Sequence, residues 1–586
     1  MAASSESQVQ RVVHSIEQGR LAGLIRISLT IVGVAALALA YLFVEFKGLS
    51  AANGIDHAQI ARELAAGRGF STKCLRPLAI QQIQSVTGRI PASNFPDTYH
   101  APLNSMIDAV GLNSFPKVLQ AKINNDSPVF AGDRLIAAVS VVFFLLAVAV
   151  TFLIGTMLFD RRVALTACGL VVVADQFWRF ALSGLPQMLM LFLFSCTALC
   201  LVMAIKAKAR RKRPFLIFFP LGICLGLMAL THPATLWLTA GTALYCGIYF
   251  RPRVVIGLIP LIICLGIFSI WIVRDYQLTK TPFGVSPYAF LESMPGSNGA
   301  WMRQANPDLS EINPLAIRKH ALEELKNQFG LLYILLGGVV VAPLFFVSLL
   351  HSFKRTETAD FKWAILLLWI FAFAGSAVLG IDGESVGPNQ FHILFGPLMA
   401  LYGAAFVLVL WNRLHPQSRI LRTLFLGGLF VLTGFPALLG LFSGGPRVNF
   451  PPYLPGLMQL FSNWTNPEEI ICSDMPWAIA WYADRKALLL PAKVKEFNNS
   501  YDYQTLGGPI VGLYLSPISR DAGFGSSILS GEYKDWAALM LGGPRAVPDF
   551  PLKVPLALAE NQCLYLSDRV RWNQVAEKPP DEQKAN

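Results

Sequence analysis

The sequence predicts a mainly α-helical protein that crosses a membrane many times. Of the 586 residues, 54% are hydrophobic and only 14% are charged, whereas a soluble domain is about 45–50% apolar and about 25% charged. Several uninterrupted apolar runs approach or exceed the roughly 20 residues that are needed to cross a bilayer. These two observations, with a mean hydropathy of +0.50, predict a polytopic helical protein whose main partner is the lipid bilayer.

Eleven apolar runs are candidate membrane spans. The first, residues 22–46, is longer than the apolar part of a cleavable signal, which has about 7–15 residues, and no small-residue cleavage site follows it, so we interpret it as a retained anchor. The other ten runs are residues 133–157, 162–177, 186–205, 214–230, 234–250, 254–273, 329–351, 363–380, 392–411 and 423–442. The sequence therefore predicts about eleven transmembrane helices.

The distribution of charge predicts how these spans are oriented. The formal net charge is +12, but residues 446–586 carry 13 Lys/Arg against 15 Asp/Glu, so the excess of positive charge lies elsewhere. It is concentrated in short breaks between spans, such as residues 206–213, and basic breaks are typical of cytoplasmic loops. This predicts a plasma-membrane protein with its N-terminus inside and residues 47–132, 275–328 and 443–586 outside. No basic face with interleaved aromatic residues indicates nucleic-acid binding.

The chain after the last span predicts a separate domain. Residues 468–474, 486–491, 509–517 and 563–569 have strand patterns, and residues 475–484 have a helical pattern. Strands and a helix joined by short links favour a small α/β domain. We therefore predict a membrane domain over residues 1–445, which includes the outer loop 47–132, and an external α/β domain over residues 446–586.

The nine cysteines show no metal-binding pattern. There is no CxxC and no zinc-site spacing, and six of the nine lie in or near apolar runs, where cysteine is a small buried hydrophobe. Cys472 and Cys563 fall in the predicted external domain, and a disulfide between them is one possibility in an oxidising compartment. The sequence predicts no cofactor.

Asp56 is the first candidate for chemistry. It follows the first span closely, and Ile60 and Leu64 fall on one side of a helix over residues 56–66, which predicts a short helix lying on the membrane surface. Gly67 and Gly69 would end that helix. Asp56 could be the N-cap of the helix, or it could accept a proton from, or orient, an attacking hydroxyl or amine.

Residues 54–72, GIDHAQIARELAAGRGFST, resemble the first outer loop of the GT-C class of membrane glycosyltransferases. That class includes the protein O-mannosyltransferases and the aminoarabinose transferases that modify lipid A. Its pattern is close to D-E-A-x-Y-x-x-x-A-R-x-L-x-x-G-x-G-F. The matching positions are Asp56, Ala58, Ala61, Arg62, Leu64, Gly67, Gly69 and Phe70.

The resemblance continues along the chain in the same order. TYHAPLNSMIDA (98–109) looks like the segment ahead of the second span, LTHP (230–233) stands where the class often has L-T-R-P, and WIVRDYQLTKTPF (271–283) resembles W-x-x-R-N-Y-x-x-x-G-x-P-F. SDMPWAIAWYADR (473–485) looks like the external domain appended to some bacterial members. The resemblance implies the GT-C fold for a mainly α protein of about eleven transmembrane helices.

The resemblance also implies an activity and residue roles. A GT-C enzyme would move a sugar from a polyprenyl-phosphate donor of the undecaprenyl type to a lipid, glycan or protein acceptor outside the membrane. Asp56 matches the catalytic carboxylate. Arg274 matches a cationic position at the outer end of the seventh span, suited to the lipid phosphate, with a snorkelling interfacial arginine as the alternative.

Other polar residues are candidates for substrate binding. His57, His100, His232 and His392 all map to the outer side, where they could meet phosphate or sugar hydroxyls, hold a divalent ion beside Asp97, or be ordinary surface histidines. Glu63 comes seven residues after Asp56, about two turns along the same face, and could be a second carboxylate or a solvated one.

The sequence departs from the class pattern at three places. His57 replaces the usual second acidic residue, Gln187 stands where an acidic residue is common, and Gln390-Phe391-His392 occupies the stretch where an arginine is expected. Two further functions therefore stay open: a transporter or flippase, although ionisable residues here gather at span ends rather than at span centres, and a non-catalytic GT-C-like subunit of a membrane assembly.

Overall fold

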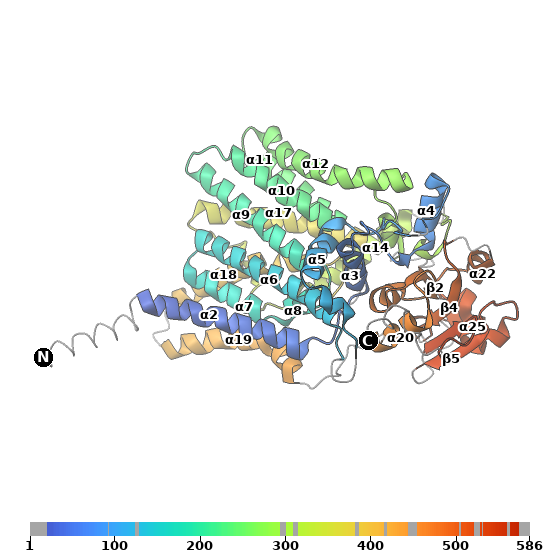
Figure 1. Ribbon diagram of the computed structural model, residues 1–586. Coiled ribbons are helices and arrows are strands. Elements are labelled where there is room, and N and C mark those ends of the chain that lie inside the picture. Colours follow the sequence, from blue (N-terminus) through green and yellow to red (C-terminus); the bar gives the residue numbers. More distant parts are fainter. Residues whose placement is uncertain are drawn as a thin grey trace, which may run out of the picture.

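The computed structural model describes residues 20–572 apart from a set of short gaps. The gaps are residues 92, 124–127, 293–300, 309–313, 381–385, 415–418, 443–453, 503–505, 521–527, 530 and 559–562. A bundle of apolar helices forms one part of the molecule and a domain with a mixed β-sheet forms the other, with helix α3 (Ala52–Ala65) between them (Figure 1). The protein is therefore a mainly helical, multi-pass membrane protein with a C-terminal α/β domain.

Within the described residues, six helices are long and apolar enough to cross a membrane. They are α2 (Arg20–Ala40) with its continuation Tyr41–Glu45, α6 (Ala131–Leu158), α9 (Gln187–Ala209), α12 (Arg253–Thr279), α17 (Thr356–Leu379) and α19 (Arg419–Phe442). The pair α7 (Arg161–Val173) and α8 (Asp175–Ala181) is bent by 61° and makes a seventh if it is counted as one span.

Helices also occupy the remaining predicted spans, but in shorter or interrupted form. These are α10 (Phe218–Thr231), α11 (Leu236–Tyr249), α15 (Leu332–Leu335) with α16 (Leu344–Ser348), and α18 (Gly396–Leu414). Helices α10 and α11 have 14 residues each, fewer than the roughly 20 that a full crossing needs. The structure thus supports six or seven spans by length and composition, and the count of eleven stays a prediction.

Segment 329–351 is interrupted because of two glycines. Gly337 and Gly338 have φ of +91° and +66°, a conformation that glycine adopts without steric cost. A Cβ on Gly337 would lie 2.3 Å from the ring of Phe177. The break therefore lets the backbone of this segment approach α8 closely.

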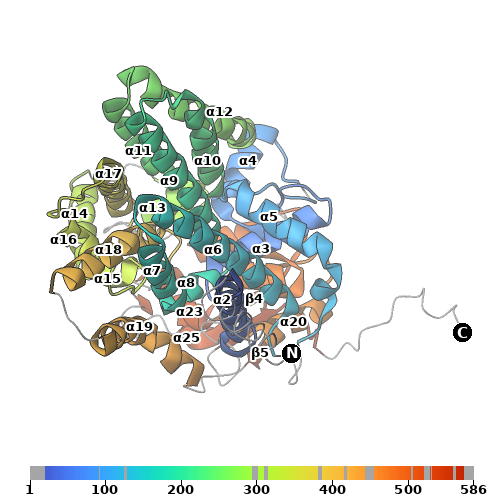
Figure 2. The same ribbon diagram turned by 90° about the vertical axis from the view of Figure 1, so that its left-hand side faces the viewer.

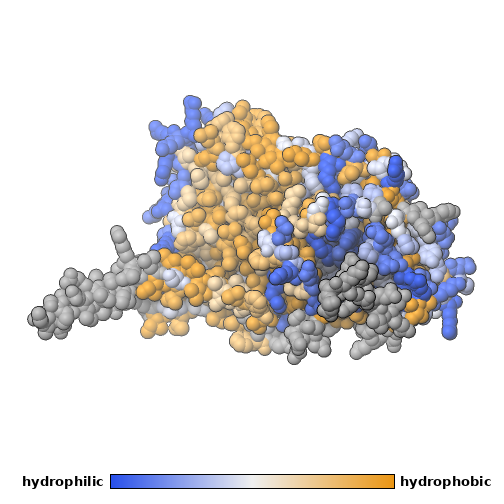
Figure 3. Space-filling view, viewed as in Figure 1, coloured by the Kyte–Doolittle hydropathy of each residue, from blue (hydrophilic) through white to orange (hydrophobic). Residues whose placement is uncertain are grey.

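The outside of the helical part is apolar, as a lipid-facing surface must be. Figure 3 shows hydrophobic residues over the bundle, with hydrophilic residues at its far end and over the C-terminal domain. Leu29, Ile270 and Leu424 are 66%, 73% and 66% exposed. In Figure 2, α6 and α9 lie near the centre of the bundle and α12 and α19 nearer its edges, in agreement with the heavier burial of α9.

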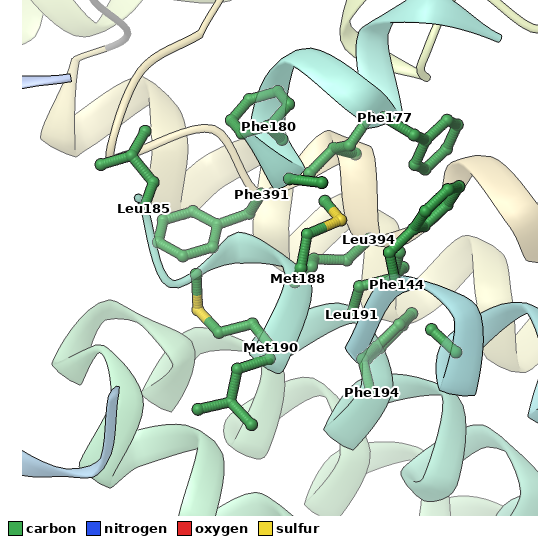
Figure 4. Close-up of a cluster of buried hydrophobic side chains, with 14 of the residues drawn as sticks. Phe144, Phe177, Phe180, Leu185, Met188, Met190, Leu191, Phe194, Phe391 and Leu394 are labelled. Carbon is green, nitrogen blue, oxygen red and sulfur yellow. The ribbon is translucent and has the colours of Figure 1, made fainter. Parts of the chain in front are cut away.

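A cluster of aromatic and aliphatic side chains fixes the start of α9 (Figure 4). Phe144 of α6 stacks on Phe177 of α8 with ring centroids 5.6 Å apart, and Trp178 donates a hydrogen bond to the Val172 carbonyl at 2.7 Å. Leu185, which is 1% exposed, comes from the turn just before α9. Because buried side chains of this size pack in defined rotamers, the cluster holds that turn in place.

The C-terminal domain is built on a six-stranded sheet of order β1-β3-β2-β4-β6-β5. Strands β1 (Cys74–Leu75), β3 (Lys486–Leu489), β2 (Ile470–Ser473) and β4 (Ile510–Leu515) are parallel, and β6 (Cys563–Ser567) and β5 (Val554–Leu558) are antiparallel to their neighbours. The four predicted strands and the predicted helix, present as α21 (Pro476–Ala478) and the π-helical turn Ile479–Ala483, are confirmed. Helices α20 (Pro455–Trp464) and α22 (Val494–Asp502) belong to the same domain.

Two strands of the sheet were not predicted. Strand β5 lies at the edge of the sheet and contains Pro555, as edge strands can. Strand β1 comes from the loop after α3, so the sheet includes two residues from far outside 446–586. The predicted boundary at residues 445 and 446 lies outside the described residues.

The possible Cys472–Cys563 disulfide is wrong. Neither cysteine forms a disulfide, and both are buried. Cys472 is in β2 and Cys563 is in β6, and β4 lies between these two strands, so the side chains belong to strands that do not pair.

The C-terminal domain is fixed to the helices by buried polar contacts. Asp133 of α6 accepts hydrogen bonds from Trp481 Nε1 at 2.6 Å and from Tyr482 Oη at 2.7 Å. Arg62 of α3 donates to the Trp481 carbonyl at 2.8 Å and forms an ion pair with Asp484 at 2.8 Å. Helix α3 is therefore clamped between the bundle and the domain.

Candidate active site

A cavity of about 640 Å³ lies where the helix ends meet the C-terminal domain. Helix α3 forms part of its wall, the start of α9 and the end of α10 form another part, and residues of the C-terminal domain close it. Its ionisable lining includes Asp56, His57, Arg76, His100, His232 and Arg303. A cavity of this size with convergent polar groups is the usual form of a small-molecule or cofactor site.

Helix α3 begins four residues before Asp56, because its N-cap is Ala51 and its first residue is Ala52. Asp56 therefore lies within the helix, and the alternative that it is an N-cap is wrong. The expectation of a helix lying on the membrane surface is also wrong, because residues 54–63 are all buried. Helix α3 packs against α5 (Pro102–Ser114) on one side and against α21 on the other.

The carboxylate of Asp56 is buried in an ion pair. Its Oδ2 accepts a hydrogen bond from Arg76 Nη2, its Oδ1 accepts one from Gln59 Nε2 at 3.0 Å, and the residue is 2% exposed. Arg76 also donates to Asp97 Oδ1 at 3.4 Å and stacks over the Tyr99 ring at 4.4 Å. Although burial opposes the charged form, Asp56 and Asp97 together raise the pKa of Arg76.

Asp97 holds His100 from two directions. Asp97 Oδ2 accepts a hydrogen bond from the His100 backbone N–H at 2.7 Å and lies 3.3 Å from His100 Nδ1. His100 Nε2 lies 3.6 Å from Asp56 Oδ2. Burial alone would raise the pKa of Asp97, but His100 and then Arg76 hold it well below its usual range, so Asp97 is an anion.

Three of the four candidate histidines, His57, His100 and His232, line the cavity. His57 and His100 have ring centroids 4.4 Å apart, and His232 lines the same cavity from the end of α10. His57 Nδ1 lies 2.9 Å from Ser105 Oγ, and burial lowers the pKa of His57 well below its usual value, so this ring is neutral at pH 7.

The fourth histidine, His392, lies away from the cavity. Its Nδ1 accepts a hydrogen bond from Trp369 Nε1 at 3.1 Å, and its Nε2 lies 2.9 Å from Gln328 Oε1. Gln187 is also buried, and it donates to the carbonyls of Gly387 and Pro388 at 3.1 and 2.7 Å. It therefore links the start of α9 to the segment that precedes His392.

Glu63 and Arg274 flank the site without lining the cavity. Glu63 is 3% exposed and pairs with Arg68 at 2.5 Å and Lys73 at 3.5 Å, so it is not a solvated carboxylate. Arg274 donates to the carbonyl of Asp97 at 2.8 Å and to that of Phe70 at 3.2 Å. It supports the backbone at Asp97 and also pairs with its neighbour Asp275 at 2.7 Å.

Sequence reasoning missed residues that line the cavity from the loops and the C-terminal domain. Arg76 precedes the proline that opens α4 (Pro77–Thr87), and no motif marks it. Arg303 pairs with Glu532 at 2.5 Å, and Asp474, at the end of β2, accepts a hydrogen bond from Ser516 Oγ at 2.8 Å. Asp474 follows a predicted strand, which is the one sequence signal that could have found it.

The described residues hold no group of three or more His, Cys, Asp or Glu side chains that could bind a metal ion. Asp97, which was considered as a metal ligand, contacts Arg76 and His100 instead. The contacts of the site are thus ion pairs and hydrogen bonds to nitrogen, suited to orienting a polar substrate.

No protein-family model matches the sequence, and a search of curated proteins gives no match. Solved structures do match. ArnT from Cupriavidus metallidurans, bound to undecaprenyl phosphate, is 13% identical to this chain. Its TM-score is 0.55, and the match covers 93% of this chain and 99% of that one. The apo state of the same ArnT is also 13% identical, with a TM-score of 0.54 over 94% of this chain and 100% of that one. The archaeal oligosaccharyltransferase AglB from Archaeoglobus fulgidus, in complex with an inhibitory peptide and a dolichol-phosphate, is 12% identical with a TM-score of 0.52 over 93% and 74%. The chain therefore has a GT-C-like fold.

Proposed function

We propose that this protein is a glycosyltransferase that takes a sugar from a polyprenyl-phosphate donor and transfers it to an acceptor on the outer face of the membrane. The observation that carries the proposal is the position of Asp56: a buried carboxylate that lines a cavity between membrane helices and the C-terminal domain. The GT-C-like fold over 93% of the chain supports it, because the similar structures hold undecaprenyl phosphate and a dolichol-phosphate.

The proposal includes a topology and a division into domains. The N-terminus is inside, about eleven helical segments build a membrane domain over residues 1–445, and the domain over residues 446–586 is outside. This arrangement follows from the basic breaks between spans, such as residues 206–213. It gives the cavity access to lipid-linked donors at the outer boundary of the bilayer, where nucleotide sugars are absent.

The chemistry is a direct displacement that inverts the sugar carbon and needs no metal. The acceptor hydroxyl or amine attacks the anomeric carbon, and the prenyl phosphate leaves with the bonding electron pair. Asp56, held by Arg76 and Gln59, orients the acceptor. His57 and His100 line the cavity beside it and donate or accept hydrogen bonds with sugar hydroxyls or phosphate oxygens.

The flanking residues take supporting roles in this proposal. Arg274 places the backbone of Asp97 and adds positive charge for the phosphate as the lipid approaches. Glu63 and His392 act on the substrate only through other residues. Glu63 does so through its ion pairs with Arg68 and Lys73. His392 does so through its hydrogen bond with Gln328. The acceptor is a lipid, a glycan or a protein.

The test is release of the lipid carrier by purified protein. The protein in detergent is incubated with undecaprenyl phosphate carrying mannose, glucose or aminoarabinose, together with a total envelope extract as the source of acceptor. We expect one donor to yield undecaprenyl phosphate and a glycosylated acceptor, and Asp56→Asn to abolish both while the protein stays folded.

A control variant removes a carboxylate that lies outside the cavity. Glu468, whose pair with Lys486 is exposed, is changed to Gln, and this variant should retain full turnover. Passage of the intact donor across liposomes without cleavage would instead indicate a flippase. No turnover by the wild type with any donor and any extract would identify a non-catalytic subunit.

A further inference from the structure

His100 is held in the manner of a catalytic histidine. One ring nitrogen, Nδ1, lies 3.3 Å from Asp97 Oδ2, and the same oxygen accepts the His100 backbone N–H at 2.7 Å. A carboxylate in this position fixes the ring orientation and favours the tautomer with the proton on Nδ1, which leaves Nε2 free to accept a proton. The residue is 7% exposed and lines the cavity.

The second ring nitrogen has no hydrogen-bond partner. His100 Nε2 is enclosed, and among the described residues nothing donates to it or accepts from it. Asp56 Oδ2 lies 3.6 Å from it, which is beyond hydrogen-bond distance. Because buried polar atoms are nearly always satisfied, an unpartnered nitrogen in a cavity wall indicates that a ligand atom completes it.

Asp56 is poorly placed to be the proton acceptor itself. Its Oδ1 is engaged by Gln59 and its Oδ2 by Arg76. Asp56 and His100, whose facing atoms lie 3.6 Å apart, therefore differ. Both carboxylate oxygens of Asp56 already accept hydrogen bonds, whereas Nε2 of His100 has no partner.

We propose that His100, oriented by Asp97, is the general base of the reaction, and that it removes the proton from the acceptor while Asp56 orients the acceptor. This inference rests on the proposed glycosyl transfer. The acceptor oxygen or nitrogen forms a bond to the anomeric carbon, and the bond from that carbon to the phosphate oxygen breaks, with its electrons going to the prenyl phosphate. The acceptor proton moves to Nε2 and later to water.

The charges around His100 suit the imidazolium that this step creates. Helix α3 presents Asp56 and His57, the N-cap of α4 presents Arg76, the loop carries Asp97 and Tyr99, and His232 lines the same cavity from the end of α10. Two carboxylates and one guanidinium leave one net negative charge when the histidines are neutral.

The test measures undecaprenyl phosphate release by the full-length protein, with the donor that the wild type uses. For His100→Ala we expect kcat to fall about 100-fold or more, the usual contribution of general base catalysis, with KM for the donor little changed. Added imidazole should restore a part of kcat, in proportion to the concentration of its neutral form, because it can occupy the space that the side chain leaves.

Two variants keep the test decisive. His100→Gln, which fills the space, should show the same loss without rescue by imidazole, and the pH dependence of its kcat should differ from that of the wild type. Asp97→Asn should lower kcat less than His100→Ala, because Asp97 positions the imidazole ring and does not itself accept the proton. His351→Gln, a histidine outside the cavity beside Phe353, is the matched control and should retain wild-type turnover.

Three results would overturn the inference. His100→Gln that retains kcat within about threefold excludes a general base, as does a rise in KM with kcat unchanged, which would make His100 a binding residue. Failure of imidazole to restore a folded His100→Ala, with an unchanged pH profile in His100→Gln, leaves only a structural role. If the wild type releases no undecaprenyl phosphate from any donor, glycosyl transfer itself fails, and that outcome is distinct from the other three.

Discussion

The guanidinium of Arg76 and the carboxylate of Asp56 form a buried ion pair in the cavity wall, with side chains 6% and 2% exposed. Arg76 belongs to the N-cap of α4 and Asp56 to α3, so the pair ties together two segments of the same loop. Such a pair offers little net stability over an apolar pair of the same volume, but removal of one partner leaves an uncompensated charge. The pair is therefore sensitive to single substitutions in a way that can be measured.

We expect Arg76→Gln to destabilise the protein by about 3–5 kcal/mol, the cost of breaking a buried ion pair. Two carboxylates, Asp56 and Asp97, would lose their shared cation. The double variant with Asp56→Asn should recover a part of this loss, because one of the two anions is then absent. Thermal unfolding of the single and double variants in detergent measures the coupling. Additive effects of the two changes would contradict it.

The sequence was sufficient for the elements whose pattern is local. Most of the apolar runs coincide with helices. The four predicted strands of the tail lie at the predicted places, because short apolar runs between turn residues indicate buried strands without tertiary information. Asp56 and His100 were identified as candidates, and both line the cavity. Their roles remain predictions.

Features that depend on long-range contacts were not predictable. Burial of α3 results from its packing against α5 and also from contacts with residues more than 400 positions away, such as the bond from Arg62 to Trp481. Strand β1 has two residues and forms only because β3 pairs with it. Arg76 lacks any local pattern, since its importance comes from the two carboxylates that the fold brings to it.

Attachment of the C-terminal domain should depend on Asp133. Asp133→Leu removes the shared acceptor of the Trp481 and Tyr482 hydrogen bonds, and the loss of such an acceptor from a buried donor costs about 1–3 kcal/mol. We expect faster proteolytic cleavage within residues 476–484 while the helical bundle stays intact. Glu468→Gln, which removes an exposed ion pair, should leave the cleavage rate unchanged, since such pairs contribute about 0–1 kcal/mol. Equal cleavage rates for the two variants would argue against a role of Asp133 in holding the C-terminal domain to the helices.

The proposed topology can be tested by labelling of single cysteines. Lys212 and Lys534 are exposed residues on opposite sides in this topology. In whole cells, a membrane-impermeant maleimide should label Lys534→Cys but should label Lys212→Cys only after the cells are opened. The protein without an introduced cysteine gives the background from its nine cysteines. Labelling of Lys212→Cys in intact cells would place the basic break outside and would remove the access to lipid-linked donors on which the proposal depends.

Close backbone packing in the bundle predicts a sharp difference between two glycines. A Cβ on Gly403 of α18 would lie 1.8 Å from the Val341 carbonyl oxygen, whereas Gly427 of α19 has no atom within 4 Å. Gly403→Ala must shift one backbone against another, and we expect a loss of about 1–3 kcal/mol, as for overpacked cores. Gly427→Ala should be neutral or slightly stabilising, because alanine favours helix by about 0.5–1 kcal/mol. The measurement is the midpoint of thermal unfolding of each variant. Equal midpoints for Gly403→Ala and Gly427→Ala would contradict the close contact at Gly403.

The neutral state of His57 should make the fold sensitive to acid. Burial holds the pKa of His57 well below its usual value, while in the unfolded chain a histidine has a pKa of about 6.5. Above about pH 6.5 neither state binds the proton, but below it the unfolded state binds the proton first, so stability falls as the pH falls. We expect the unfolding temperature of His57→Gln to depend less on pH than that of the wild type between about pH 5 and pH 7. Ser105→Ala removes the hydrogen-bond partner of His57 without removing a titrating group, so it should keep the wild-type dependence. If His57→Gln and the wild type lose stability in parallel on acidification, the proton is taken up elsewhere and His57 does not control this transition.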